Sequence, residues 1–126
     1  MLREMKDMPA GTLGFEAIGD VDDDDWEDTV EPVLRREIAA GAKLRLLYLL
    51  GPDVRDLDSD VLKADTGFRA RHAKAFERIA IVCDETGVKS AVRVLSMLTP
   101  GRMRAFPASE LAAAKRWLAE PGEDST

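Results

Sequence analysis

Two short apolar runs stand out along the chain, and a stretch with helical periodicity separates them. The runs occupy residues 43–50 (KLRLLYLL) and 78–83 (RIAIVC), and a turn-like segment follows each of them. Strands that a sheet buries on both faces have this composition, whereas a half-exposed strand alternates apolar and polar residues. We therefore expect the two runs to lie side by side at the centre of a sheet that has a parallel component.

The N-terminal residues predict a second kind of strand pair. Residues 2–8 favour a short strand, and Pro9-Ala10-Gly11 then supplies a turn, because proline fixes one backbone dihedral and glycine frees another. Residues 12–18 alternate apolar and polar side chains, as a half-exposed strand does. We expect these two strands to pair in the antiparallel direction.

Apolar residues at helical spacing predict four helices. The first starts at Asp22 or Asp23, ends at Gly41, and contains Pro32, which is expected to kink or restart it. The second runs over about residues 60–75, after a polar loop over 53–60. The third covers about residues 88–98, and the fourth follows Pro107 with Ser109 as its cap. The residues expected to face the core from these helices are Trp26, Val30, Val33, Leu34 and Ile38, then Val61, Phe68, His72 and Ala75, then Val88, Ala91, Val92, Leu95 and Leu98, and finally Leu111, Ala114 and Leu118.

With an edge strand over residues 102–106, the element order becomes β-β-α-β-α-β-α-β-α. This order predicts an α/β fold, a single-domain mixed-sheet sandwich of four to five strands and four helices. The domain should span residues 1–120, and residues 121–126 should form a flexible C-terminal tail.

The net charge and the hydropathy of the chain argue against some classes of function. The 126 residues carry a formal net charge of −6, which argues against a nucleic-acid partner. Nothing at the N-terminus resembles a signal peptide, and no stretch approaches the roughly 20 apolar residues that cross a bilayer. We expect a cytoplasmic protein, with peripheral contact to a membrane as an open alternative.

The residues that carry chemistry are few and scattered. His72 is the single histidine and Cys83 the single cysteine, so no disulfide within the chain or thiolate metal cluster can form. Neither has an evident partner for nucleophilic catalysis or zinc binding. Asp84 follows a strand, where it could serve acid–base chemistry or cap the third helix. We expect a protein that is not an enzyme and that has no cofactor or metal.

Two charged clusters allow both a structural and a functional interpretation. The acidic run over residues 20–28 lacks the glycine and the final glutamate of an EF-hand loop, so we favour helix capping over calcium binding. The bases Arg69, Arg71, Lys74 and Arg78 could contact anionic lipid headgroups, or they could form a solvated face that pairs with the acidic half of the chain.

Several local signatures, in this order, resemble the SpoIIAA-like family, whose fold is that of STAS domains. They are the run KLRLLY at 43–48 before a Gly-acid break, His72 with Phe76, Arg78, Ala80 and Asp84, Pro100-Gly101 with Arg104 and Phe106, and Ala114 with Trp117-Leu118. The resemblance covers about residues 4–120. It implies a sheet of four or five strands packed with four helices. It also implies an ability to hold an apolar or lipid-like ligand and to rest on membranes, with helices that open.

Two functions are consistent with this resemblance. The first is a non-enzymatic module that holds a small apolar or lipid-like ligand between helices and sheet, in a pocket lined by Leu50, Leu62, Phe68, His72, Val88 and Leu95. The second is a STAS-type protein–protein regulatory module, like an anti-sigma-factor antagonist, with a phosphorylation switch at Ser59. Ser59 or Asp58 could equally be a plain helix cap. A homodimer through the edge strand and Trp117 is a further prediction.

Overall fold

The computed structural model describes residues 1–83 and 103–120, apart from the side chains of Pro52 and Asp53. Within these described residues, five strands form one sheet in the order β1-β2-β3-β4-β5. β1 pairs antiparallel with β2, and all the other neighbours are parallel. The strands are β1 Leu2–Glu4, β2 Leu13–Val21, β3 Leu44–Leu57, β4 Phe76–Cys83 and β5 Met103–Phe106. The predicted α/β class and its mixed sheet are confirmed.

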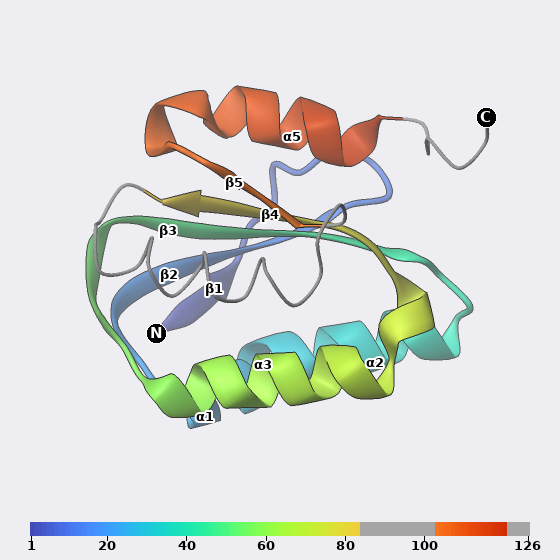
Figure 1. Ribbon diagram of the computed structural model, residues 1–126, viewed down its shortest axis with the longest axis horizontal. Helices are drawn as coiled ribbons and strands as arrows, with labels where there is room; N and C mark the ends of the chain where they lie inside the picture. The colour runs from blue at the N-terminus through green and yellow to red at the C-terminus, as the bar shows by residue number, and fades with distance from the viewer. Residues whose placement is uncertain (84–102, 121–126) are drawn as a thin grey trace.

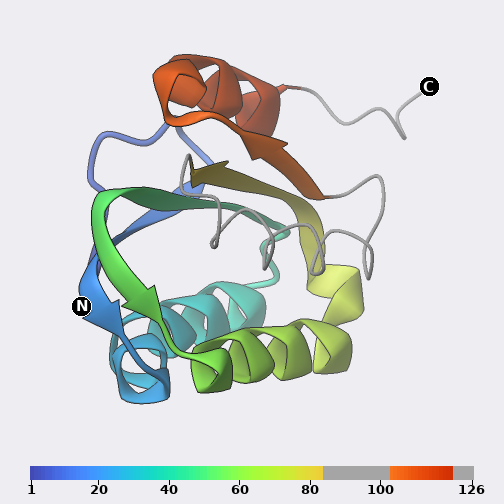
Figure 2. The same ribbon diagram turned by 60° about the vertical axis from the view of Figure 1, so that its left-hand side comes forward.

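Helices cover both faces of this sheet. α1, α2 and α3 lie on one face and α5 lies on the other, as both views show (Figure 1, Figure 2). The helices are α1 Asp23–Asp25, the π-helical turn η1 Trp26–Val30, α2 Glu31–Ala39, α3 Ser59–Arg71 and α5 Leu111–Ala119, with 3-10 turns η2 Ala73–Ala75 and η3 Ala108–Glu110. The predicted helix over residues 88–98 and the predicted tail over 121–126 lie outside the described residues.

β3 and β4 are the two central strands that the apolar runs predict. They pair in parallel, with Leu46 beside Ile79 and Leu50 beside Cys83. Alternate residues face opposite sides, so Leu46 joins the core beneath α1–α3 and Leu47 joins the core beneath α5. Both side chains are fully buried. The prediction that a sheet buries both faces of these strands is therefore confirmed.

The helical region after β2 follows the predicted pattern closely. Asp22 caps α1 in a reciprocal capping box with Asp25, which satisfies two backbone N–H groups. Pro32 lies in the first turn of α2, directly after the π-helical turn, which agrees with the predicted restart of the helix at this residue. Gly41 has φ +81° and ends α2, with the Ala42 N–H donating to the Glu37 carbonyl as in a Schellman motif.

The segment after residue 50 differs from the prediction. Residues 53–60 were expected to be a polar loop, but β3 continues to Leu57 and pairs with the end of β2, with Gly19 beside Val54 and Val21 beside Leu57. Register shifts around Gly19, whose φ is +64°, let the two strands stay paired. Tertiary pairing and the burial of Val54 therefore override the local turn signal of Gly51-Pro52.

Two smaller predictions near the ends of the chain are also wrong. β1 ends at Glu4 instead of residue 8, and Ser109 does not cap the last helix, because the turn η3 precedes α5 and occupies Ser109. Trp117 packs against Phe106 with ring centroids 5.9 Å apart and is buried. It therefore offers little surface to the predicted homodimer contact, and the homodimer itself stays a prediction.

Candidate functional site

A buried chain of polar side chains crosses the core between the sheet and α3. The Trp26 indole Nε1–H donates to the Tyr48 hydroxyl at 3.2 Å, and that hydroxyl donates to Asp65 Oδ1 at 2.8 Å. The other carboxylate oxygen, Asp65 Oδ2, accepts from Arg69 Nε at 3.0 Å. We call these four residues the polar chain. Each of them is at least nine-tenths buried.

The sequence places these residues together through simple periodicities. Tyr48 alternates with Leu46 and Leu50 on the face of β3 that meets α3. Asp65 lies one helical turn after the buried Val61, and Arg69 lies one turn further, so the ion pair joins positions i and i+4 of α3. The turn η1 supplies Trp26 at the start of the same layer. A strand, a helix and a helical turn thus hold the polar chain.

Burial and charge both act on the Tyr48 hydroxyl. Desolvation, followed by the negative charge of Asp65, raises the pKa of Tyr48 well above its usual value. The phenol is therefore held protonated as the donor to Asp65. The Asp65 carboxylate is compensated by the Arg69 guanidinium, which a carboxylate at this depth requires.

Tyr48 makes this electrostatic claim measurable, because it is the only tyrosine in the chain. Below the pKa of an unfolded tyrosine, about 10, both the folded and the unfolded state keep the proton. Above it the unfolded state releases the proton while the folded state retains it, so stability falls as the pH rises. Titration followed by near-ultraviolet absorbance should show phenolate only when circular dichroism shows unfolding. Phenolate formation near pH 10 in the folded protein would contradict the burial of this hydroxyl.

A small cavity lies next to the polar chain. Its volume is about 50 Å³, and it lies between the sheet and the layer formed by η1 and α3. Its polar residues are Trp26, Tyr48 and Asp65, and its apolar walls come from Leu2, Val21, Leu50, Leu57, Val61, Leu62 and Ile81. The site thus combines a mostly apolar wall with one hydrogen-bonding end.

The structure brings together only part of the predicted pocket. Leu50 and Leu62 line the cavity, as expected for a space between helix and sheet. Phe68 does not line it: the ring is fully buried and packs between Trp26 and Phe76, at centroid distances of 5.6 and 6.2 Å. His72 ends α3, about two turns after the cavity-lining Asp65, and packs on the Phe68 ring with centroids 4.4 Å apart. The predicted pocket residues Val88 and Leu95 lie outside the described residues.

The predicted basic patch does not form. Arg69 is 4% exposed and Arg78 is 7% exposed, so neither presents its charge to solvent. They lie on opposite faces of the sheet, because Arg69 contacts Asp65 beneath β3 whereas Arg78 donates to the Trp117 carbonyl of α5. Only Arg71 and Lys74 stay exposed. Ion pairing inside α3 and stacking of Arg78 on the Trp117 ring, 5.0 Å from its centroid, explain the difference.

Ser59 is exposed at the first position of α3. Its neighbour Asp58 provides the cap, since its side chain accepts from the Asp60 backbone N–H at 2.9 Å. Of the two predicted caps, Asp58 is therefore the correct one. The Ser59 hydroxyl stands between two acidic neighbours, Asp58 and Asp60.

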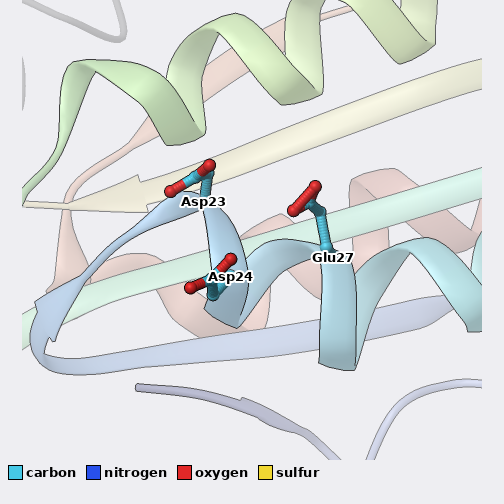
Figure 3. A group of neighbouring side chains, drawn as sticks. All are labelled: Asp23, Asp24 and Glu27. Atoms are coloured by element: carbon cyan, nitrogen blue, oxygen red, sulfur yellow. The ribbon is translucent and has the colours of Figure 1, made fainter.

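The acidic run begins the helical region beneath the sheet. One carboxylate oxygen from each of Asp23, Asp24 and Glu27 lies within 4.8 Å of the other two. Figure 3 shows the three side chains at the start of the helical region formed by α1 and η1. Charge repulsion from Asp23 and Asp22 raises the pKa of Asp24, whereas the hydrogen bond from the Asp22 backbone lowers that of Asp25. The capping box supports the structural interpretation of this run.

Sequence reasoning missed most of the polar chain. Asp65 carried a usable signal, because it occupies a core-facing position of α3 between Val61 and Phe68, and its partner Arg69 follows four residues later. The sequence pattern identifies Tyr48 only as part of an apolar run. Nothing in the sequence indicates that Trp26, Tyr48 and Asp65 meet, since their contact depends on how η1 and α3 pack on β3.

Comparison with known proteins gives a consistent result. A family model described as SpoIIAA-like matches residues 12–119. A crystal structure of an uncharacterized protein from the DUF3478 family, with a SpoIIAA-like fold, from Shewanella loihica PV-4, has 23% sequence identity and a TM-score of 0.72, and the match covers 94% of each chain. No curated protein matches the chain. Within residues 1–83 and 103–120, none of the helices has both the length and the apolar character that crossing a membrane requires.

Proposed function

Because the chain belongs to the SpoIIAA-like family, we propose that it is a binding module without enzymatic activity, whose cavity beside Tyr48 takes a small apolar or lipid-like ligand. The observation that carries this proposal is the cavity itself, with apolar walls and the Tyr48–Asp65 pair at one end. Concave, mostly apolar sites with a few convergent polar groups are where proteins hold small ligands.

The size of the cavity limits the ligand. A cavity of about 150 Å³ lined by aliphatic residues accommodates benzene, and this one measures about 50 Å³. In its present form it therefore holds only a few atoms of a ligand, namely the polar group beside Tyr48 and Asp65 and the carbons next to it. Leu57 and Leu62 are only half-buried and line it. A longer chain would require the α3 side of the cavity to move outward at these two residues.

The polar chain supports binding more than catalysis. Asp65 is held in an ion pair with Arg69, and the raised pKa of Tyr48 keeps its hydroxyl protonated at neutral pH. General acid–base catalysis works best with a group whose pKa lies near the working pH. The Tyr48 hydroxyl does not meet that condition. Tyr48 and Asp65 both suit a fixed hydrogen-bonding end for a ligand.

Filling the cavity should weaken ligand binding strongly without unfolding the protein. Val61 lines the cavity from α3, so Val61→Phe places a ring in the space that a ligand would use. We expect binding of 1-hexanol, followed by amide chemical shifts, to weaken by at least about tenfold. If the unmodified protein co-purifies with a ligand, native mass spectrometry of gently purified Val61→Phe should show the protein without it.

A matched control is Val33→Phe, since Val33 is a half-buried valine of α2 that does not line the cavity. This variant should bind as the unmodified chain does. If Val61→Phe folds and still binds 1-hexanol with unchanged affinity, the cavity is not the binding site and the proposed function fails.

The regulatory alternative has one observation in its favour, the exposure of Ser59 at the start of α3. A phosphate there would meet the free N–H groups of a helix N-terminus. It would also stand beside Asp58 and Asp60, whose charges repel it, and Asp58 already accepts a backbone N–H. We therefore rank this alternative second.

We do not extend the function to a membrane surface, because Arg69 and Arg78 are buried.

A further inference from the structure

We infer that the cavity selects ligands whose polar end is an uncharged hydrogen-bond donor, such as an alcohol, over ligands that end in a carboxylate. This inference rests on the proposed function and specifies the chemical class of the ligand. It follows from counting the donors and acceptors of the side chains that line the cavity.

The donors at the polar end are already in use. Trp26 has a single N–H, which it donates to Tyr48, and Tyr48 has a single O–H, which it donates to Asp65. Among the lining residues these are the only side-chain donors that the structure describes. A ligand that needs to accept a hydrogen bond from a side chain in the cavity therefore finds no donor that is not already engaged.

Acceptor capacity, by contrast, remains. The ionised Asp65 carboxylate can accept about four hydrogen bonds. Two of them come from Tyr48 and Arg69. Since Asp65 lines the cavity, a hydroxyl group at the polar end can donate to it. Hydrogen bonds to a charged group are stronger than neutral ones, so this contact separates alcohols from ligands without a donor.

Charge separates alcohols from carboxylates as well. Asp65 and Arg69 balance each other, with Nε and Oδ2 3.0 Å apart. A ligand carboxylate would bring a second negative charge beside Asp65, and the described residues that line the cavity include no base. Placing an uncompensated charge in a buried site is strongly unfavourable. A ligand ammonium group would also lose its hydration in the cavity. It would gain little in return, because the Asp65 carboxylate that it would meet is already paired with Arg69.

Three ligands of one chain length test the inference on the full chain at neutral pH. These are 1-hexanol, its isomer 1-methoxypentane, which has no donor, and hexanoate, which is ionised. Affinities come from titrations followed by amide chemical shifts. We expect 1-hexanol to bind about tenfold or more tightly than 1-methoxypentane, and hexanoate to bind most weakly.

The Asp65→Asn variant adds a second readout. An asparagine removes the negative charge and supplies an N–H donor at the same place. The preference for 1-hexanol over hexanoate should therefore shrink by at least about tenfold in this variant. If the variant does not fold, the comparison of the three ligands on the unmodified chain still decides the matter.

The possible results distinguish a failure of this inference about ligand class from a failure of the proposed binding function. Equal binding of 1-hexanol and 1-methoxypentane, both lost in Val61→Phe, would overturn the inference and leave the proposed function standing. Hexanoate binding as tightly as 1-hexanol would also overturn it. Absence of binding by all three ligands would overturn both.

Discussion

Replacing Asp65 with alanine is expected to lower the free energy of unfolding by about 3–5 kcal/mol. The carboxylate accepts from Tyr48 Oη and Arg69 Nε, and both partners are buried. Without it, Arg69 loses the ion pair inside α3, and the Tyr48 hydroxyl loses its acceptor. Since small domains have only about 5–15 kcal/mol of stability, we expect a large fall in the urea midpoint.

Two further variants show whether the ion pair causes this loss. Asp60→Ala removes an exposed carboxylate from the same helix and should change the stability by less than about 0.5 kcal/mol. The double variant Asp65→Leu/Arg69→Met removes both charges and should regain most of the stability that Asp65→Ala loses. If Asp65→Ala and Asp60→Ala had the same small effect, the polar chain would not stabilise the core.

Truncating Phe68 to alanine is expected to cost about 3–5 kcal/mol of unfolding free energy. The ring is fully buried and contacts Trp26, His72 and Phe76, and the Arg35 guanidinium lies 5.3 Å from its centroid. Its removal leaves a cavity among these side chains, so thermal and urea unfolding should both shift strongly.

The Phe68→Leu variant is the control for Phe68→Ala. Leucine refills most of the volume and should lose much less stability than alanine. Both variants should bind 1-hexanol in proportion to the fraction that stays folded, because Phe68 does not line the cavity. If Phe68→Ala kept the stability but lost the ligand, Phe68 would be a pocket residue after all, as the sequence analysis expected.

The architecture could be predicted because its signals are local and redundant. The run at residues 43–50 is apolar on both alternating faces, and the structure gives each face its own core. Asp22 and Gly41 mark the ends of the first helical region in ways that depend only on neighbouring residues. The continuation of β3 to Leu57 was missed because it depends on pairing with β2, which no local pattern encodes.

The candidate site could be predicted only in its apolar part. Leu50 and Leu62 follow from strand and helix periodicity, and both line the cavity. Arg69 was assigned to the surface because arginine is rarely fully buried unless it is paired, and its partner Asp65 had not been recognised. Arg78 was misplaced for a similar reason, since its contacts with Trp117 and Glu120 span about forty residues of sequence.

The most direct test of the central claim is the position of 1-hexanol bound to the full, isotopically labelled chain. Intermolecular nuclear Overhauser effects locate the ligand by its neighbours. We predict contacts from the alkyl chain to the methyl groups of Leu50, Val61 and Ile81, with the hydroxyl-bearing carbon nearest the Tyr48 ring. Contacts confined to residues of the α5 face, such as Leu47 and Val82, or the absence of any contact to the cavity, would contradict the account.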